Sequence, residues 1–231
     1  MKNTTIIFDL DGTLVDTAPD LARTLNHILT SAGQRSLSPE KVISYVGHGA
    51  RQMLERGFQA VGISLSEDEL DAHMATFLDH YGANIAVESR PFPGVIDAIS
   101  TLRSQGARLG VCTNKLEGLS RKLLDQLALS QHFEAIIGGD TLTVRKPDPE
   151  HLLSTIARSG GTPSRAIMIG DSETDIRTAK AANIPVIAVN FGYTIEPVES
   201  FEPDVIIGHY DDLIDHIDAM LAHMEAVPET S

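Results

Sequence analysis

The sequence has a single cysteine, few basic residues and no long hydrophobic run. With only Cys112 in 231 residues, an internal disulfide is excluded, which fits a reducing cytoplasm. The apolar stretch before Asp9 is too short for a signal peptide or a membrane span, and no later run is long enough. We therefore expect a cytoplasmic protein without membrane contact.

Positive charge is also scarce, because 18 Lys and Arg face 32 Asp and Glu, a net charge of −14 at pH 7. This excess disfavours nucleic acid and anionic membranes as partners. The nine histidines lack metal-ligand spacing; His73 with His80 and His216 with His223 are more typical of solvated helix surface than of a zinc site. Cys112 is expected to pack inside a strand, since no paired base that would make it a nucleophile is evident.

The chain has enough apolar content, 42%, for one large domain and a smaller insertion. From residue 17 to about 88 the pattern is helical throughout, with apolar residues at helical spacing from Leu21 to Leu29 and helix starts at Ser38 and Ser66. From Pro91 onward helices alternate with strands, expected near 107–112, 134–138, 165–170, 185–190 and 204–207.

This alternation predicts an α/β fold, a doubly wound and mostly parallel sheet covered by helices on both faces. Residues 1–16 and 90–225 would form the α/β core, and residues 17–89 an inserted all-helical cap joined by hinges near 15–18 and 89–93. Residues 226–231 are expected to be a frayed tail. Ligands of such sheets bind at the carboxyl ends of the strands.

Two aspartates, Asp9 and Asp11, directly follow the apolar run of residues 4–8. If the chain stays extended through Asp11, its period of two points both carboxylates the same way. Carboxylates on one face repel, so the pair suggests a divalent cation, or one group that reacts while the other moves protons. Gly12 and Thr13 then turn the chain away. Taken alone, the pair could also be a strand that ends in turn-forming residues.

Three later segments add polar groups after apolar strands or rigid turns. Thr113 and Asn114 offer a hydroxyl and an amide suited to phosphoryl oxygens. Lys146, beside two prolines, could be held as a fixed partner for an anion. Asp171 ends a strand as Asp9 does, and Asp175 lies one turn into the following helix. Separately, these segments could be a polar turn, a surface lysine and acids that complement a helix dipole.

In this order, DLDGT, TN, KPDP and GDSETD resemble the four motifs of the haloacid dehalogenase superfamily of phosphohydrolases, across Thr4 to about Val189. Within it the chain is most similar to the phosphoglycolate phosphatases. Added similarity lies in Tyr45–Arg51, Thr113–Lys115, Gly138–Thr141 and Phe191–Tyr193. Leu116, where that family often has proline, and Glu173-Thr174, in place of a basic residue and Asn, depart from the pattern and bear on substrate more than on reaction type.

The resemblance implies a Rossmann-like core and hydrolysis of a small phosphate monoester through an aspartyl-phosphate. Asp9 would be the nucleophile, and Asp11 would protonate the leaving alcohol and then deprotonate the attacking water. Thr113 would hold the transferring oxygens, and Lys146 would bridge the phosphoryl group and Asp9.

The resemblance also implies Mg²⁺ as the cofactor. Its ligands would be the side chains of Asp9 and Asp171 and the backbone carbonyl of Asp11, while Asp175 would orient the metal shell.

The expected substrate is 2-phosphoglycolate, a small phosphorylated metabolite, and the expected state is a monomer or homodimer. Glycines on both sides of His48 make residues 46–51 a loop that opens a helix, where Gly47 and the Arg51 guanidinium could meet a carboxylate. Asn114 and Lys115 would complete the substrate site. The alternative is that Arg51 covers the first turn of a surface helix.

Other functions are compatible with parts of this pattern. Sugar phosphates or pyrophosphate could replace phosphoglycolate as the substrate. A phosphomutase similar to β-phosphoglucomutase needs a cap that excludes water and carries its own acid/base, and no cap residue stands out for that. A dehalogenase would leave Asp11 idle. A binding module without catalysis is disfavoured because every chemical position is filled.

Overall fold

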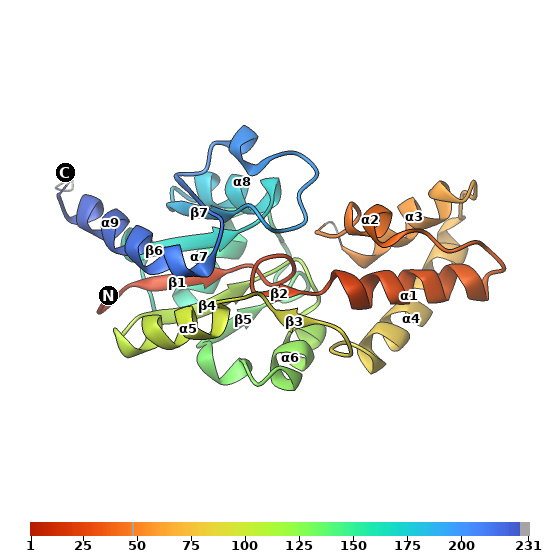
Figure 1. Ribbon diagram of the computed structural model, residues 1–231, viewed down its shortest axis with the longest axis horizontal. Helices are drawn as coiled ribbons and strands as arrows, with labels where there is room; N and C mark the ends of the chain where they lie inside the picture. The colour runs from red at the N-terminus through yellow and green to blue at the C-terminus, as the bar shows by residue number, and fades with distance from the viewer. Residues whose placement is uncertain (48, 227–231) are drawn as a thin grey trace.

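The computed structural model describes residues 1–47 and 49–226 and has a six-stranded parallel sheet as its centre (Figure 1). The strand order is β5-β4-β1-β6-β7-β8, so the chain winds outward from the central strand β1 in both directions. The strands are β1 (Thr5–Phe8), β4 (Arg108–Cys112), β5 (Ala135–Ile137), β6 (Ala166–Gly170), β7 (Val186–Val189) and β8 (Val205–Ile207). Each lies within two residues of the predicted range, and the predicted fold class is confirmed.

Helices cover both faces of the sheet, which explains why the strands are apolar without alternation. Along β1, Ile6 and Phe8 join one apolar cluster and Ile7 the other. Helices α7 (Pro149–Arg158) and α8 (Glu173–Ala181) pack on the Ile7 face, and α5 (Val95–Ser104), α6 (Glu117–Gln126) and α9 (Leu213–Ala226) on the opposite face. Short 3₁₀ turns at Ser130–His132, Pro163–Arg165, Val198–Phe201 and Tyr210–Asp212 complete the connections.

Four helices lie between β2 and β3 and form what we call the helical insertion: α1 (Ala18–Ser31), α2 (Pro39–Ile43), α3 (Ala50–Ala60) and α4 (Glu67–Ala83). The starts of α2 and α4 follow the predicted signals, since Ser38 caps α2 and Ser66 forms a capping box with Glu69 in α4. Figure 1 places them beyond the carboxyl end of β1, beside the sheet. The domain boundaries stated above remain a prediction.

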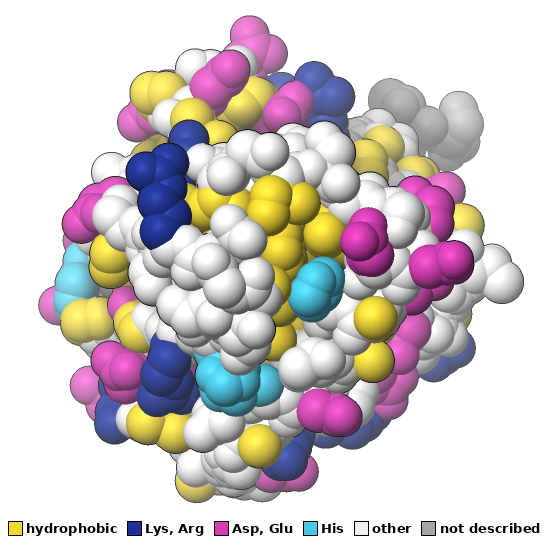
Figure 2. All heavy atoms as spheres, turned by 90° about the vertical axis from the view of Figure 1, so that its right-hand side faces the viewer, with side chains coloured by type: hydrophobic (Ala, Val, Ile, Leu, Met, Phe, Trp, Pro, Cys, Tyr) yellow, Lys and Arg dark blue, Asp and Glu magenta, His cyan; other side chains and the backbone are white. Residues whose placement is uncertain are grey.

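The outer end of the helical insertion faces the viewer in Figure 2. Hydrophobic side chains gather near its centre, and polar and charged side chains of both signs surround them. Packed against α2, α3 and α4, helix α1 buries Leu21, Leu25, Ile28 and Leu29, the residues whose spacing predicted the helix. The histidines of α4 were expected on a solvated helix surface. In the structure their rings also pack on other aromatic rings, since His73 stacks on Phe58 and His80 stacks on His27.

A two-stranded antiparallel ribbon, which the sequence did not predict, joins the two connections to the helical insertion. It consists of β2 (Val15–Asp16) and β3 (Arg90–Pro91), at the positions where hinges were expected. Beside it, the buried carboxylate of Asp20 accepts hydrogen bonds from the amides of Glu88 and Ser89 and from the Ser89 hydroxyl. The segments at the beginning and at the end of the helical insertion are therefore hydrogen-bonded to each other.

The sequence analysis aligned Asp9 with Asp11 on the assumption that the chain stays extended through Asp11. In the structure the strand ends at Phe8. The Asp9 amide still donates to the Ile169 carbonyl of β6, and the chain then turns, with Gly12 at φ +87°. Asp11 consequently reaches the site from a turn, not from the strand. Residues 227–231, most of the expected tail, lie outside the described residues, and no helix in the described part has the length and apolar character needed to cross a bilayer.

Candidate active site

The predicted catalytic residues come together at the carboxyl edge of the sheet. Asp9, Thr113 and Asp171 directly follow β1, β4 and β6, three adjacent parallel strands, and all three are buried. Lys146 comes from the segment between β5 and α7, and its Nζ lies 2.8 Å from Asp9 Oδ1 and 2.6 Å from Asp175 Oδ1. Parallel strands explain the meeting, because their carboxyl ends share one edge.

Asp9, Asp171 and Asp175 offer three carboxylate oxygens within 4.8 Å of one another. Burial raises the pKa of Asp9 from 3.8 to about 6, against the opposing effect of Lys146. Burial, with the charges of Asp175 and Asp9, also raises the pKa of Asp171 well above its usual value. The single positive charge of Lys146 is too little to neutralise three buried carboxylates that lie this close together. Their hard oxygen donors fit a divalent ion such as Mg²⁺.

Asp175 has both carboxylate oxygens occupied by donors. Oδ1 accepts from Lys146, and Oδ2 accepts from the amides of Asp171 and Ser172 and from the Ser172 hydroxyl. Ser172 caps helix α8 and forms a capping box with Asp175. This arrangement favours the predicted orienting role of Asp175 over direct metal ligation.

Two glycines make room for the carboxylate of Asp171. A Cβ at Gly192 would lie 2.2 Å from Asp171 Cβ, and a Cβ at Gly12 would lie 2.5 Å from Asp171 Oδ2. The Asp171 oxygens also accept hydrogen bonds from Thr13 Oγ1, at 2.9 Å, and from the amide of Tyr193, at 2.8 Å. The surrounding backbone thus fixes the orientation of this carboxylate.

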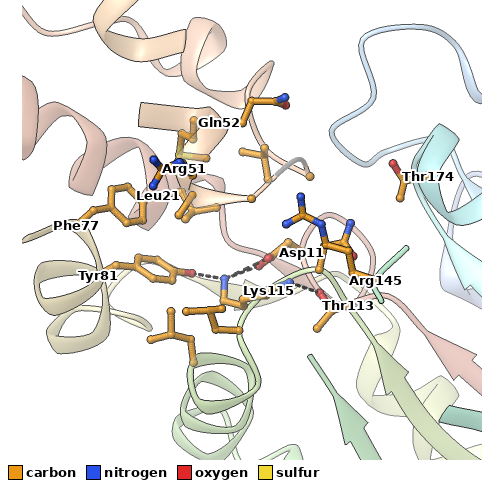
Figure 3. A pocket seen from close by; sticks show the side chains of 18 of the residues that line it. Asp11, Leu21, Arg51, Gln52, Phe77, Tyr81, Thr113, Lys115, Arg145 and Thr174 are labelled. Atoms are coloured by element: carbon orange, nitrogen blue, oxygen red, sulfur yellow. Dashed lines mark hydrogen bonds and ion pairs between the residues drawn. The ribbon is translucent and has the colours of Figure 1, made fainter. Parts of the chain in front are cut away.

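Asp11 is held by groups that the sequence did not connect to it. Its carboxylate accepts from Thr17 Oγ1 at 2.7 Å and from Lys115 Nζ at 2.9 Å. The same Lys115 ammonium donates to the hydroxyl of Tyr81, in helix α4, at 2.7 Å (Figure 3). Burial opposes the charge of Lys115, but Asp11 and Tyr81 outweigh it and raise its pKa. Lys115 therefore links the proposed acid/base residue to the helical insertion.

Tyr193 is a second contact that sequence reasoning missed. Its hydroxyl donates to Asp16 and accepts from the amides of Thr17, at 2.6 Å, and Ala18, at 3.0 Å, while its own amide donates to Asp171. The sequence did show that Phe191–Tyr193 is similar to one protein family. That similarity did not indicate what Tyr193 contacts or does. Tyr193 therefore connects the acidic cluster, which consists of Asp9, Asp171 and Asp175, to the start of helix α1.

Cys112 does have a base beside it, contrary to the sequence analysis. His151 Nδ1 lies 3.3 Å from the thiol, and His151 Nε2 lies 3.0 Å from the carbonyl oxygen of Gly138. Because that carbonyl can only accept, Nε2 carries the proton, and the thiol donates to Nδ1. Burial raises the pKa of Cys112 to about 12 and lowers the pKa of His151. The pair stays neutral, so Cys112 is unsuited to act as a nucleophile.

A cavity of about 340 Å³ separates the catalytic edge from the helical insertion (Figure 3). On the core side it is lined by Asp9, Asp11, Thr113 and Lys146, with Asn114, Lys115 and Arg145 beside them. The insertion contributes apolar side chains, among them Leu21, Met53, Phe77 and Leu78. Gly47 and Gly49, of the loop predicted to contact substrate, also line it, but His48 between them lies outside the described residues. A phosphate ester could enter here and meet Asp9.

Two predicted substrate contacts have partners of their own. The Arg51 guanidinium lines the cavity but pairs with Glu67 and Asp71 of α4, which favours the alternative that it covers a helix surface. The Asn114 side-chain amide donates to the carbonyl of Lys146 at 3.1 Å and so steadies that segment. Substrate binding by these residues, and by Gly47 and Lys115, stays a prediction.

Comparison with known proteins gives consistent matches across most of the chain. A family model described as haloacid dehalogenase-like hydrolase matches residues 6–189. Phosphoglycolate phosphatase of Mesorhizobium japonicum is 51% identical over 213 residues, which cover 92% of this chain and 94% of the relative. The Caulobacter vibrioides phosphoglycolate phosphatase is 49% identical, with coverage of 92% and 90%. A crystal structure described as a predicted phosphoglycolate phosphatase from Haemophilus somnus has a TM-score of 0.87 at 30% identity, covering 93% of this chain and 98% of that one.

Proposed function

The chain belongs to the haloacid dehalogenase-like hydrolases and is a phosphoric monoester hydrolase, and we propose that it converts 2-phosphoglycolate to glycolate and phosphate through an aspartyl-phosphate. The observation that carries the mechanism is the meeting of Asp9, Asp11, Thr113 and Lys146 at one wall of the cavity. The names of the relatives support the substrate. A cytoplasmic location and a monomeric or homodimeric state remain predictions.

In the first chemical step, a carboxylate oxygen of Asp9 attacks phosphorus, and the bond from phosphorus to the ester oxygen breaks. Asp11 gives its proton to the departing alkoxide, which leaves as the alcohol. Thr113 Oγ1 already accepts from the Lys115 amide, so its hydroxyl proton is free to bind a phosphoryl oxygen. Lys146, fixed between Asp9 and Asp175, neutralises charge beside the nucleophile.

In the second step, Asp11 removes a proton from the water that attacks phosphorus, and the Asp9 carboxylate is released with inorganic phosphate. Asp11 must exchange partners during this cycle, because Lys115 and Thr17 hold its carboxylate in the structure. The helical insertion would serve as a cap, residues 17–89, over a core of residues 1–16 and 90–225. Its Tyr81 hydroxyl would keep Lys115 in place as Asp11 turns to the substrate.

The acidic cluster would hold Mg²⁺ through the side chains of Asp9 and Asp171 and the backbone carbonyl of Asp11. When bound, the ion offsets the negative charges that would otherwise keep a carboxylate from approaching a phosphate ester. Asp175 would act indirectly, since it holds Lys146 and the Asp171 amide. The raised pKa values of Asp9 and Asp171 support a cation here, because both carboxylates are buried with too little positive charge.

A substrate panel with mass spectrometry tests this function. We expect 2-phosphoglycolate to give the highest kcat/KM among glucose 1-phosphate, pyrophosphate and p-nitrophenyl phosphate, each with Mg²⁺. After acid quench, the intact wild-type protein should carry one added phosphate, and Asp9→Asn should carry none and have no turnover. Asp11→Asn, with the activated aryl ester, should accumulate the phosphorylated form.

The control is Asp125→Asn, which removes an exposed carboxylate of α6 away from the cavity and should behave as the wild type. Phosphate on Asp9→Asn at the wild-type level would place the nucleophile elsewhere. A panel led by a sugar phosphate or pyrophosphate would reject phosphoglycolate and keep the phosphatase. Transfer to a second hydroxyl of the substrate instead of water would identify a phosphomutase.

A further inference from the structure

Among the residues that the structure describes, four Lys and Arg side chains line the cavity, and three of them are already paired. Lys146 contacts Asp9 and Asp175, and Lys115 contacts Asp11. Arg51, on the helical insertion, pairs with Glu67 and Asp71. The fourth is Arg145, whose guanidinium has no hydrogen bond or ion pair with any residue in the described part of the chain.

The backbone of Arg145 is fixed although its side chain is exposed. Its carbonyl accepts from the Asp148 amide at 2.9 Å, and the carbonyl of the next residue, Lys146, accepts from Asn114. Lys146 itself is buried against Asp9. In Figure 3 the Arg145 side chain projects from the core side, near Thr113 and Asp11, into the space below the helical insertion. A free guanidinium is thus anchored one residue from a lysine that touches the proposed nucleophile.

A paired guanidinium is a poor receptor for a new anion. Arg51 would have to release two carboxylates, and Lys115 would have to release Asp11, so each contact with substrate would replace an existing one. Arg145 gives up only water. Its planar fork can bind a carboxylate through two parallel hydrogen bonds, and in a protein with net charge −14 an unpaired cation at a cavity is a favoured place for an anion.

We propose that Arg145 determines substrate specificity by binding the carboxylate of the substrate while the phosphoryl group lies between Asp9 and Thr113. This inference rests on the proposed function and deepens it, since it names the residue that distinguishes a phosphorylated acid from a neutral phosphate ester. It also reassigns to the core a role that the sequence analysis gave to Arg51 of the helical insertion.

Calorimetric titration with two unreactive phosphonates tests the assignment without relying on turnover. Phosphonoacetate carries a carboxylate, and ethylphosphonate has a methyl group in its place. Both are titrated in Mg²⁺ buffer into the full-length wild type, Arg145→Gln, Arg145→Lys and Arg51→Gln. Arg158→Gln is the matched control, because Arg158 is an exposed arginine of α7 that does not line the cavity. Thermal unfolding of each variant checks that it is folded.

We expect the wild type and Arg158→Gln to prefer phosphonoacetate. In Arg145→Gln the ratio of the two affinities should fall by roughly tenfold or more, as expected for a lost charged hydrogen bond, and Arg145→Lys should recover part of it. An unchanged ratio in Arg145→Gln, a loss confined to Arg51→Gln, or no preference in the wild type would each overturn the assignment. Failure of the wild type to hydrolyse 2-phosphoglycolate would instead refute the proposed function.

Discussion

Replacing the proposed nucleophile should make the metal-free protein more stable while abolishing its activity. Burial raises the pKa of Asp9 from 3.8 to about 6, so its ionised form is less favourable in the folded protein than in the unfolded chain. Asparagine has nearly the shape of the neutral acid and avoids this cost. A rise of about two pKa units corresponds to about 3 kcal/mol, and we expect a gain in the free energy of unfolding of about 1 to 3 kcal/mol in Asp9→Asn.

The pH dependence of this gain follows from the sign of the shift. Below about pH 4 the wild-type carboxyl is protonated in both states, so wild type and variant should unfold at the same urea concentration. As pH rises from about 4 to 6, the wild type loses stability relative to the variant, and above about pH 6 the difference is complete. Circular dichroism during urea unfolding at pH 4, 5, 6 and 8, on protein freed of metal, measures this difference.

Mg²⁺ should reduce this difference at pH 8. An ion that binds only the folded protein adds about 2.7 kcal/mol at a hundred times its Kd, and the variant, with one carboxylate fewer, should gain less. Asp125→Asn, which changes an exposed carboxylate, should follow the wild type throughout. A metal-free Asp9→Asn protein that is less stable than the wild type at pH 8 would refute the reasoning. It would mean that the ion pair with Lys146 outweighs the cost of burial.

Three further measurements test other parts of the site. Chelation should abolish turnover and Mg²⁺ should restore it, whereas Ca²⁺, with its larger and looser shell, should inhibit by misplacing the nucleophile; equal rates in chelator and in Mg²⁺ would contradict the metal assignment. Tyr193→Phe should lower the free energy of unfolding by about 1 to 3 kcal/mol, because Asp16 and the Thr17 amide lose their partner and the Ala18 amide loses one of two, and an unchanged urea midpoint would argue against this. Cys112 should resist iodoacetamide in the folded protein and react after unfolding in urea, since it is fully buried with a pKa of about 12; equal labelling rates would count against the neutral pair with His151.

The catalytic edge was predictable because it depends on strand ends. Asp9, Thr113 and Asp171 each follow an apolar run, and a parallel sheet brings such positions together whatever the length of the intervening chain. The helix starts at Ser38 and Ser66 were equally local, since a cap is defined by residues within one turn.

Contacts made by loops and between helices were not predictable in this way. The hydroxyl of Tyr193 meets Asp16 across 177 positions of sequence, in a segment without regular periodicity. Arg51 pairs with Glu67 and Asp71 because α3 and α4 pack together, and nothing in the spacing of these residues reveals that packing. His151 lies beside Cys112 for the same reason, since α7 packs on β4.

The ribbon of β2 and β3 has a consequence for how such a protein can diversify. The two ends of the helical insertion are paired side by side, and the Asp20 carboxylate accepts hydrogen bonds from three donor groups of Glu88 and Ser89. A segment that leaves and re-enters a fold at adjacent points can be lengthened, shortened or exchanged without changing the register of the sheet. The helical insertion can therefore change in evolution while Asp9, Thr113 and Asp171 stay in place. A new substrate would then require changes in the insertion but none in the catalytic residues of the core.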